Sequence, residues 1–123
     1  MKAAVFVPGR AAAGEYVEVR EVARPAAGPG QVVLRVSACG VCRTDLHIVE
    51  GDLPALKTDL IPGHQIVGEV VEGATAELPV GTRVGVSWMG GVDGSCWYCQ
   101  HGLENLCDAP AFTGYSLNGD GVG

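Results

Sequence analysis

Three cysteines within a span of twelve residues are the most chemically specific feature of the sequence. Cys96, Cys99 and Cys107 begin, interrupt and end the segment Cys-Trp-Tyr-Cys-Gln-His-Gly-Leu-Glu-Asn-Leu-Cys. Thiolates bind Zn²⁺ tightly, and structural zinc sites are tetrahedral with four protein ligands. Because exposed unbound thiols oxidise easily, we interpret this spacing as a metal site rather than as three unbound cysteines.

A tetrahedral site needs a fourth ligand, and Asp93 is the first choice. It precedes Cys96 by three residues, which repeats the spacing between Cys96 and Cys99. A carboxylate oxygen is an acceptable zinc ligand and carries the same single charge as a thiolate. His101 and Asp108 are alternative fourth ligands, and the sequence alone leaves this choice open.

A second group of reactive side chains lies more than fifty residues before the first, so two separate sites are expected. Cys39 and Cys42 form a Cys-x-x-Cys pair, and Thr44 and His47 follow at the start of an expected short helix. A further imidazole, His64, follows a Pro-Gly turn. From the residues alone, a redox dithiol with a core histidine and a metal site are equally good interpretations.

The rest of the chain predicts short strands that would position these groups. Residues 32, 34 and 36 are all apolar and alternate with a mixed set, so one face of that strand is expected to be apolar. One short helix is expected at residues 44–50, and the chain beyond Gly90 has the character of a loop. Many short strands with few helices predict a mainly β fold, either a partly open barrel or a sandwich. Valine-rich runs of strand length, separated by Gly and Pro, occur at residues 3–7, 16–22, 32–38, 66–71 and 83–88.

Length and charge limit the classes of function. The chain has 123 residues, so one domain over residues 1–123 is expected. Eight basic against fourteen acidic residues give a net charge of −6, which argues against a nucleic-acid partner. No apolar run approaches the roughly 18 residues of a membrane helix, and a Pro-Gly pair interrupts the N-terminus too early for a secretory signal. We therefore expect a cytoplasmic protein with no nucleic-acid or membrane partner.

Four motifs in a fixed order carry a family resemblance. They are Cys-Gly-Val-Cys-Arg-Thr-Asp-Leu-His at 39–47, Ile-Pro-Gly-His-Gln-Ile-Val-Gly at 61–68, Gly-Thr-Arg-Val-Gly-Val at 81–86 and Gly-Leu-Glu-Asn-Leu-Cys-Asp at 102–108. In this order they closely resemble the N-terminal half of the zinc-dependent medium-chain alcohol dehydrogenases. The resemblance implies a GroES-like, partly open β-barrel with a zinc-binding lobe at about residues 88–110. It also implies that small alcohols are oxidised to aldehydes or ketones with NAD(P).

The same resemblance implies roles for individual residues. Cys42 and His64 would be two of the three protein ligands of a catalytic zinc, whose family ligand set is two cysteines and one histidine. Thr44 would hydrogen-bond the zinc-bound alcohol, and His47 would pass the alcohol proton to solvent. Asp45 would hold the zinc histidine in one tautomer.

Three further positions take their meaning from the resemblance alone. Arg43 would meet the pyrophosphate of the cofactor, and Trp88 would line the substrate pocket. Cys39 falls where the family often has a small or hydroxylic residue, so it is interpreted as a bystander.

The sequence departs from the family pattern in ways that affect both sites. Asp93 stands where the family has the first of four lobe cysteines, and Gln65 follows the zinc histidine where Glu is usual. The third catalytic zinc ligand and the Rossmann cofactor domain would lie beyond residue 123. Residues 119–123 are glycine-rich, but no strand precedes them, so they are not expected to form a cofactor loop.

These departures lead to four expectations for the chain. We expect a gene shortened by a frameshift or an early stop, and about one zinc per chain, bound in the lobe. Residues 1–123 alone are expected to show no alcohol oxidation, because nothing in them positions a nicotinamide. The uncovered barrel face is expected to cause self-association unless a separate chain supplies the cofactor domain. The alternative to an enzyme is a zinc-binding domain without turnover.

Overall fold

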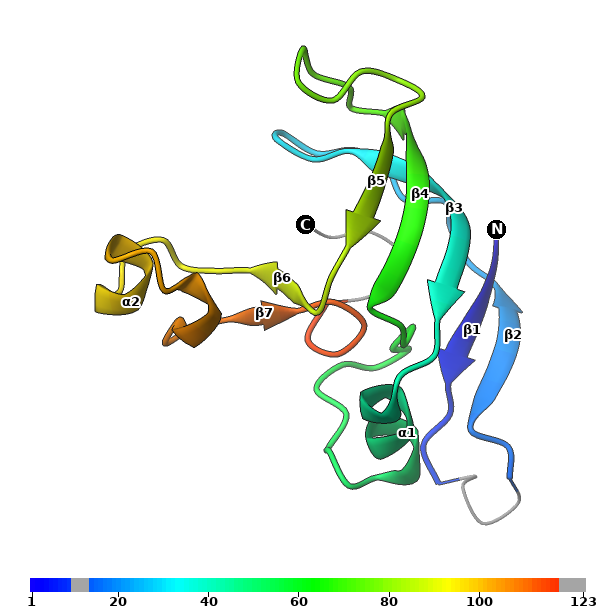
Figure 1. Cartoon of the computed structure of the whole chain (residues 1–123). Coiled ribbons are helices and arrows are strands. Elements are labelled where there is room, and N and C mark those ends of the chain that lie inside the picture. Colours follow the sequence, from blue (N-terminus) through cyan, green and yellow to red (C-terminus); the bar gives the residue numbers. More distant parts are fainter. Residues whose placement is uncertain (10–13, 118–123) are drawn as a thin grey trace.

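The structure is a computed structural model that describes residues 1–9 and 14–117, so the glycine-rich segment at 119–123 lies outside the described residues. Most of its regular structure is β, as predicted (Figure 1). The strands are β1 (Lys2–Phe6), β2 (Val17–Glu21), β3 (Val33–Gly40), β4 (Gln65–Glu72), β5 (Arg83–Val86), β6 (Met89–Gly91) and β7 (Ala111–Phe112). The helical elements are α1 (Arg43–Glu50), α2 (Trp97–Gln100) and the 3-10 helix η2 (Glu104–Leu106).

The strands form three small antiparallel sheets. β1 pairs with β2, the second sheet has the order β3-β4-β5, and β6 pairs with β7. The pairing of β3 with β4 runs from Val33 opposite Glu72 to Gly40 opposite Gln65, and two register shifts interrupt it. Such irregularities increase the local bend and twist of a strand. The sheets curve around one another without closing, which confirms the predicted partly open barrel (Figure 1).

An apolar hollow lies on the concave side of the open barrel. It has a volume of about 990 Å³ and is bounded by residues of β1, β3, β4 and β5. Val36, on the predicted apolar face, lines this hollow but is 54% exposed. Val33, from the opposite set of the same strand, is buried instead. The alternation therefore predicted the strand correctly and the burial only partly, because no described segment covers the concave side.

The buried core surrounds α1 and fixes where its first turn lies. Phe6, Ile48, Val49 and Leu60 form one cluster, and Ile48 and Leu60 are fully buried. The Phe6 N–H donates to the Leu60 carbonyl oxygen at 2.8 Å, which ties the loop before β4 to β1. Residues three and four apart share one face of a helix, so packing Ile48 and Val49 inward also turns Asp45 inward.

A lobe projects away from the barrel on the β6–β7 pair (Figure 1). The loop character predicted beyond Gly90 holds for most of this lobe, but the short elements α2, η2 and β7 also lie there. These elements have two to four residues each, too few for a hydrophobic period to reveal them. Within the described residues, no helix is long and apolar enough to cross a bilayer.

Candidate functional site

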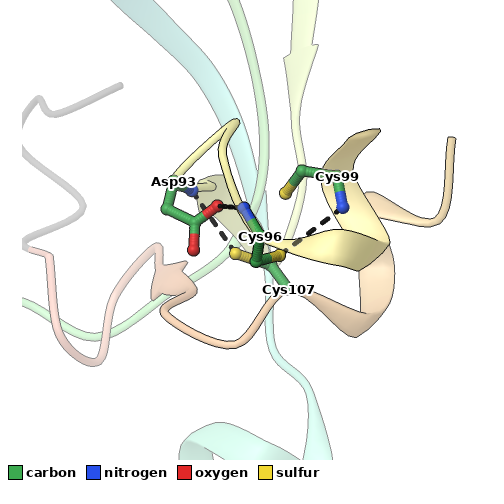
Figure 2. A group of neighbouring side chains, drawn as sticks. All are labelled: Asp93, Cys96, Cys99 and Cys107. Atoms are coloured by element: carbon green, nitrogen blue, oxygen red, sulfur yellow. Dashed lines mark hydrogen bonds between the residues drawn. The ribbon is translucent and has the colours of Figure 1, made fainter. Parts of the chain in front are cut away.

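Four side chains of the lobe point toward a common centre (Figure 2). One ligand atom each from Asp93, Cys96, Cys99 and Cys107 lies within 4.8 Å of all the others. A tetrahedral zinc with Zn–S distances of about 2.3 Å would bring its sulfurs to roughly 3.8 Å from one another. The separations between the ligand atoms would therefore have to shorten by about an ångström at most to enclose a zinc ion. Across residues 1–9 and 14–117, no other set of three or more His, Cys, Asp or Glu side chains is gathered in this way.

Backbone N–H groups of the lobe hydrogen-bond two of these sulfurs. Cys96 is the N-cap of α2, and its Sγ accepts the Cys99 N–H at 3.5 Å. The Asp93 N–H donates to the Sγ of Cys107 at 3.3 Å, which joins the start of the lobe to its end (Figure 2). Cys107 is the only one of the four that is buried. The lobe is thus folded around the cluster with N–H groups directed at sulfur.

The carboxylate of Asp93 is held by the backbone of the loop that follows it. Oδ1 accepts the N–H groups of Ser95 at 2.8 Å and Cys96 at 2.9 Å. These backbone hydrogen bonds, that of Cys96 first, lower the pKa of Asp93 to about 2. Side-chain hydrogen bonds with Cys96 and Cys99 lower the pKa of Asp93 as well. Asp93 is therefore ionised at neutral pH, as a metal ligand must be.

The thiols of Cys96 and Cys99 differ in how readily they ionise. A backbone hydrogen bond from Asp108 lowers the pKa of Cys96. Desolvation raises the pKa of Cys99 to about 12, and the hydrogen bond with Cys96 adds to that rise. Cys99 therefore keeps its proton until a cation displaces it.

The structure separates Asp93 from the two alternative fourth ligands. His101 stacks on Trp97 with ring centroids 4.1 Å apart, and its Nδ1 hydrogen-bonds the Trp97 carbonyl oxygen at 2.7 Å. Neither His101 nor Asp108 belongs to the gathered group. Asp108 contributes its backbone to Cys96 instead. Among the three candidates, the geometry favours Asp93.

In the second cluster, one buried carboxylate joins the two residues predicted to bind a catalytic zinc. Asp45 Oδ2 accepts the Cys42 N–H at 2.8 Å, and Asp45 Oδ1 accepts a hydrogen bond from Nδ1 of His64 at 3.1 Å. Asp45 and His64 are only 8% and 5% exposed. The carboxylate can only accept, so Nδ1 of His64 carries the proton and Nε2 is left for another partner. The family resemblance had implied this contact between Asp45 and His64.

The remaining residues of this cluster lie on α1. The hydroxyl of Thr44 is 3.8 Å from the Sγ of Cys42. His47 follows Thr44 by three residues and so lies beside it on the helix. Arg43 is exposed at the first position of α1. The structure also shows a contact that sequence analysis missed: the Nδ1 of His47 lies 2.8 Å from the Oδ2 of Asp52.

Aromatic side chains connect the second cluster to the β6–β7 pair that carries the lobe. Trp88 lies edge-to-face against His64 at 4.8 Å and stacks on Phe112 at 4.7 Å. The segment after β7 also meets the loop that carries His64, at Gly63 and Gly114. Sequence analysis named Trp88 but not Phe112 or Gly114, because these contacts join segments far apart in the chain. The role of Trp88 in a substrate pocket stays a prediction.

Comparison with known proteins identifies the family. The alcohol dehydrogenase GroES-like domain matches residues 28–123, and the chain belongs to this family. The predicted GroES-like fold is thereby confirmed. The chain spans about a third of the length of the curated relatives it matches.

Three relatives illustrate the similarity. An alcohol dehydrogenase of Geobacillus stearothermophilus is 45% identical over 122 residues, which cover 97% of this chain and 35% of that protein. The cobalt- and zinc-bound thermostable alcohol dehydrogenase of Pyrobaculum aerophilum aligns with a TM-score of 0.81 and 28% identity over 96% of this chain and 36% of that one. Acetophenone reductase from Geotrichum candidum, in complex with NAD, aligns with a TM-score of 0.73 and 34% identity over 95% and 34%.

Proposed function

We propose that this chain supplies the N-terminal part of the catalytic domain of an NAD(P)-dependent alcohol dehydrogenase and holds a structural zinc ion in its lobe. The observation that carries the proposal is the gathering of Asp93, Cys96, Cys99 and Cys107 within 4.8 Å in a member of the alcohol dehydrogenase GroES-like family. Three sulfurs and one carboxylate oxygen form a donor set that suits tetrahedral Zn²⁺. The P. aerophilum relative was solved with cobalt and zinc bound, which supports a bound metal in this chain.

The second cluster would contribute Cys42 and His64 to a catalytic zinc, together with a ligand from outside residues 1–123. When bound there, zinc would act as a Lewis acid toward an alcohol or carbonyl oxygen. The fit is supported by the protonated Nδ1 of His64, which leaves Nε2 as the ligating nitrogen. Asp45 would act through His64 and through the Cys42 backbone, holding both ligands in place from one buried carboxylate.

Thr44 and His47 would move the proton that alcohol oxidation releases. Thr44 lies beside Cys42 and can accept a proton from a substrate hydroxyl while donating its own. His47 lies one helical turn further along α1, and its side chain is 38% exposed, so it can return the proton to solvent. The accompanying hydride would go to the nicotinamide of NAD(P).

Two other residues would meet the small molecules. Arg43 would face the cofactor pyrophosphate, which is supported by its exposure at the start of α1. Trp88 would form part of the substrate pocket, because its ring packs directly on His64.

A zinc-binding domain without turnover is the second candidate function. One observation favours it: within the described residues, no gathered group of three or more metal-ligating side chains includes Cys42 or His64. The two candidates share the lobe site and differ only at the second cluster. An assay of alcohol oxidation with NAD(P), on the chain with and without the remainder of a relative's domain, separates them.

Zinc affinity of the lobe is expected to fall steeply as the pH is lowered from about 8 to about 6. Cys99, whose pKa is raised to about 12, must release its proton on binding. Asp93, whose pKa is about 2, is ionised throughout that range and releases none. Each proton released steepens the dependence by about tenfold per pH unit. Competition with a chromophoric chelator at several pH values measures this slope.

The variant Asp93→Asn provides the matched control for that titration. It should bind zinc more weakly at every pH, because a neutral amide is a poorer ligand, and it should keep the same slope. A pH-independent affinity would contradict the assignment of Cys99 as a ligand. An unchanged affinity in Asp93→Asn would contradict the assignment of Asp93.

A further inference from the structure

Just after the end of α1, the carboxylate of Asp52 contacts His47, the predicted proton carrier. The Oδ2 of Asp52 lies 2.8 Å from the Nδ1 of His47. A carboxylate can only accept, so this contact places a hydrogen on Nδ1 of the neutral imidazole. The other ring nitrogen, Nε2, then carries a lone pair.

The backbone around Asp52 is built to make this contact. Gly51 ends α1 in the left-handed region at φ +91°, a conformation that side chains other than glycine adopt with strain. Its N–H bonds the Ile48 carbonyl oxygen, and the N–H of Leu53 bonds the carbonyl oxygen of His47 itself at 3.0 Å. Leu53 is packed against the core cluster. Asp52 therefore lies between Gly51 and Leu53, whose backbone hydrogen bonds hold the chain close to His47.

Stability does not account for this arrangement. The side chains of His47 and Asp52 are 38% and 62% exposed. Ion pairs this exposed contribute little to folding. What a short hydrogen bond to one ring nitrogen does determine, even when exposed, is which nitrogen of a neutral histidine is protonated.

We propose that Asp52 is the positioning residue that makes Nε2 the proton-accepting nitrogen of His47. The inference rests on the proposed function, in which His47 carries the proton. In that step Thr44 takes up the substrate proton and releases its own hydroxyl proton. The released proton bonds to Nε2 of His47. The imidazolium keeps its Nδ1–H on Asp52 and then releases the Nε2 proton to water. No other bond changes.

Nitrogen-15 NMR of the full chain tests the proposal directly, because protonated and unprotonated ring nitrogens resonate far apart. In the unaltered chain, the neutral ring of His47 should carry its proton on Nδ1 and none on Nε2. In Asp52→Ala the neutral ring should revert to the Nε2–H form that imidazoles favour in water. Glu50→Ala, which removes another exposed carboxylate from the same helix, should leave the tautomer of His47 unchanged.

Two results would overturn the proposal: a predominant Nε2–H form of His47 in the unaltered chain, or the same tautomer in Asp52→Ala. Protection of the Leu53 amide from exchange shows whether the turn survives the substitution. If it does not, the tautomer of the unaltered chain decides the question alone. Zinc binding, measured on the same samples, tests the proposed function separately, because a chain that failed to bind zinc could still hold His47 as the Nδ1–H form.

Discussion

Replacing Cys107 by serine is expected to weaken zinc binding in the lobe by about a thousandfold or more. Structural four-ligand sites bind zinc with about 10–16 kcal/mol in total, so losing one thiolate removes several kcal/mol. About 4 kcal/mol corresponds to a thousandfold change in affinity. Cys107 is also the buried member of the group, and its Sγ accepts the Asp93 N–H, so the substitution disturbs a second ligand. Competition titration with a chelator measures the change.

Cys39→Ser is the matched control for that experiment. Cys39 is exposed at the end of β3 and lies outside the gathered group. It should leave the stoichiometry and the affinity of the lobe unaltered. Two results would contradict the lobe as the zinc site. One is an equal effect of the two substitutions, and the other is a full zinc equivalent bound at unchanged affinity in Cys107→Ser.

Gly114→Ala is expected to lower the free energy of unfolding by about 4 kcal/mol. Gly114 has φ +70°, where any side chain is strained. A Cβ atom there would also lie 2.3 Å from the carbonyl oxygen of Gly63 and 2.6 Å from its backbone nitrogen. Because these are backbone atoms, they cannot move away as a flexible side chain would. Chemical denaturation of the zinc-loaded chain measures the loss.

Gly30→Ala is the control that shows how much of the loss comes from backbone strain alone. The remainder comes from the close approach of a Cβ at position 114 to the backbone of Gly63. Gly30 has nearly the same φ, +73°, but nothing lies within 4 Å of the position of its Cβ. It should therefore lose only about 1–2 kcal/mol, the cost of the left-handed conformation. Equal losses in the two variants would show that the contact between Gly114 and Gly63 does not hold the loop that carries His64.

Much of the fold followed from local sequence pattern. The five strands of the barrel and the helix α1 lie within a residue or two of their predicted ends, because alternation and Gly/Pro punctuation are local signals. The exposure of Val36, on the face expected to be apolar, could not be predicted in the same way. It depends on what covers the concave side of the barrel, which a pattern within one strand does not contain.

In the candidate sites too, contacts within one short loop could be predicted from local spacing in the sequence, whereas contacts between distant segments could not. The spacing of Asp93 and Cys96 made Asp93 the first of three possible fourth ligands, and the structure gathers it with the three cysteines. The contact of Asp52 with His47 was missed, although Gly51 is a typical end of a helix and indicates that the chain turns back there. The packing of Phe112 on Trp88 joins two segments through the β6–β7 pair and left no local signal.

X-ray absorption at the zinc edge of the purified, zinc-loaded chain tests the central claim most directly. Zn–S and Zn–O distances differ by a few tenths of an ångström, at about 2.3 Å and about 2.0–2.2 Å, so the two kinds of ligand can be counted separately. We expect about one zinc per chain with three sulfur ligands and one oxygen ligand, the set offered by Asp93, Cys96, Cys99 and Cys107. A first shell made mainly of nitrogen and oxygen, with one sulfur or none, would contradict it.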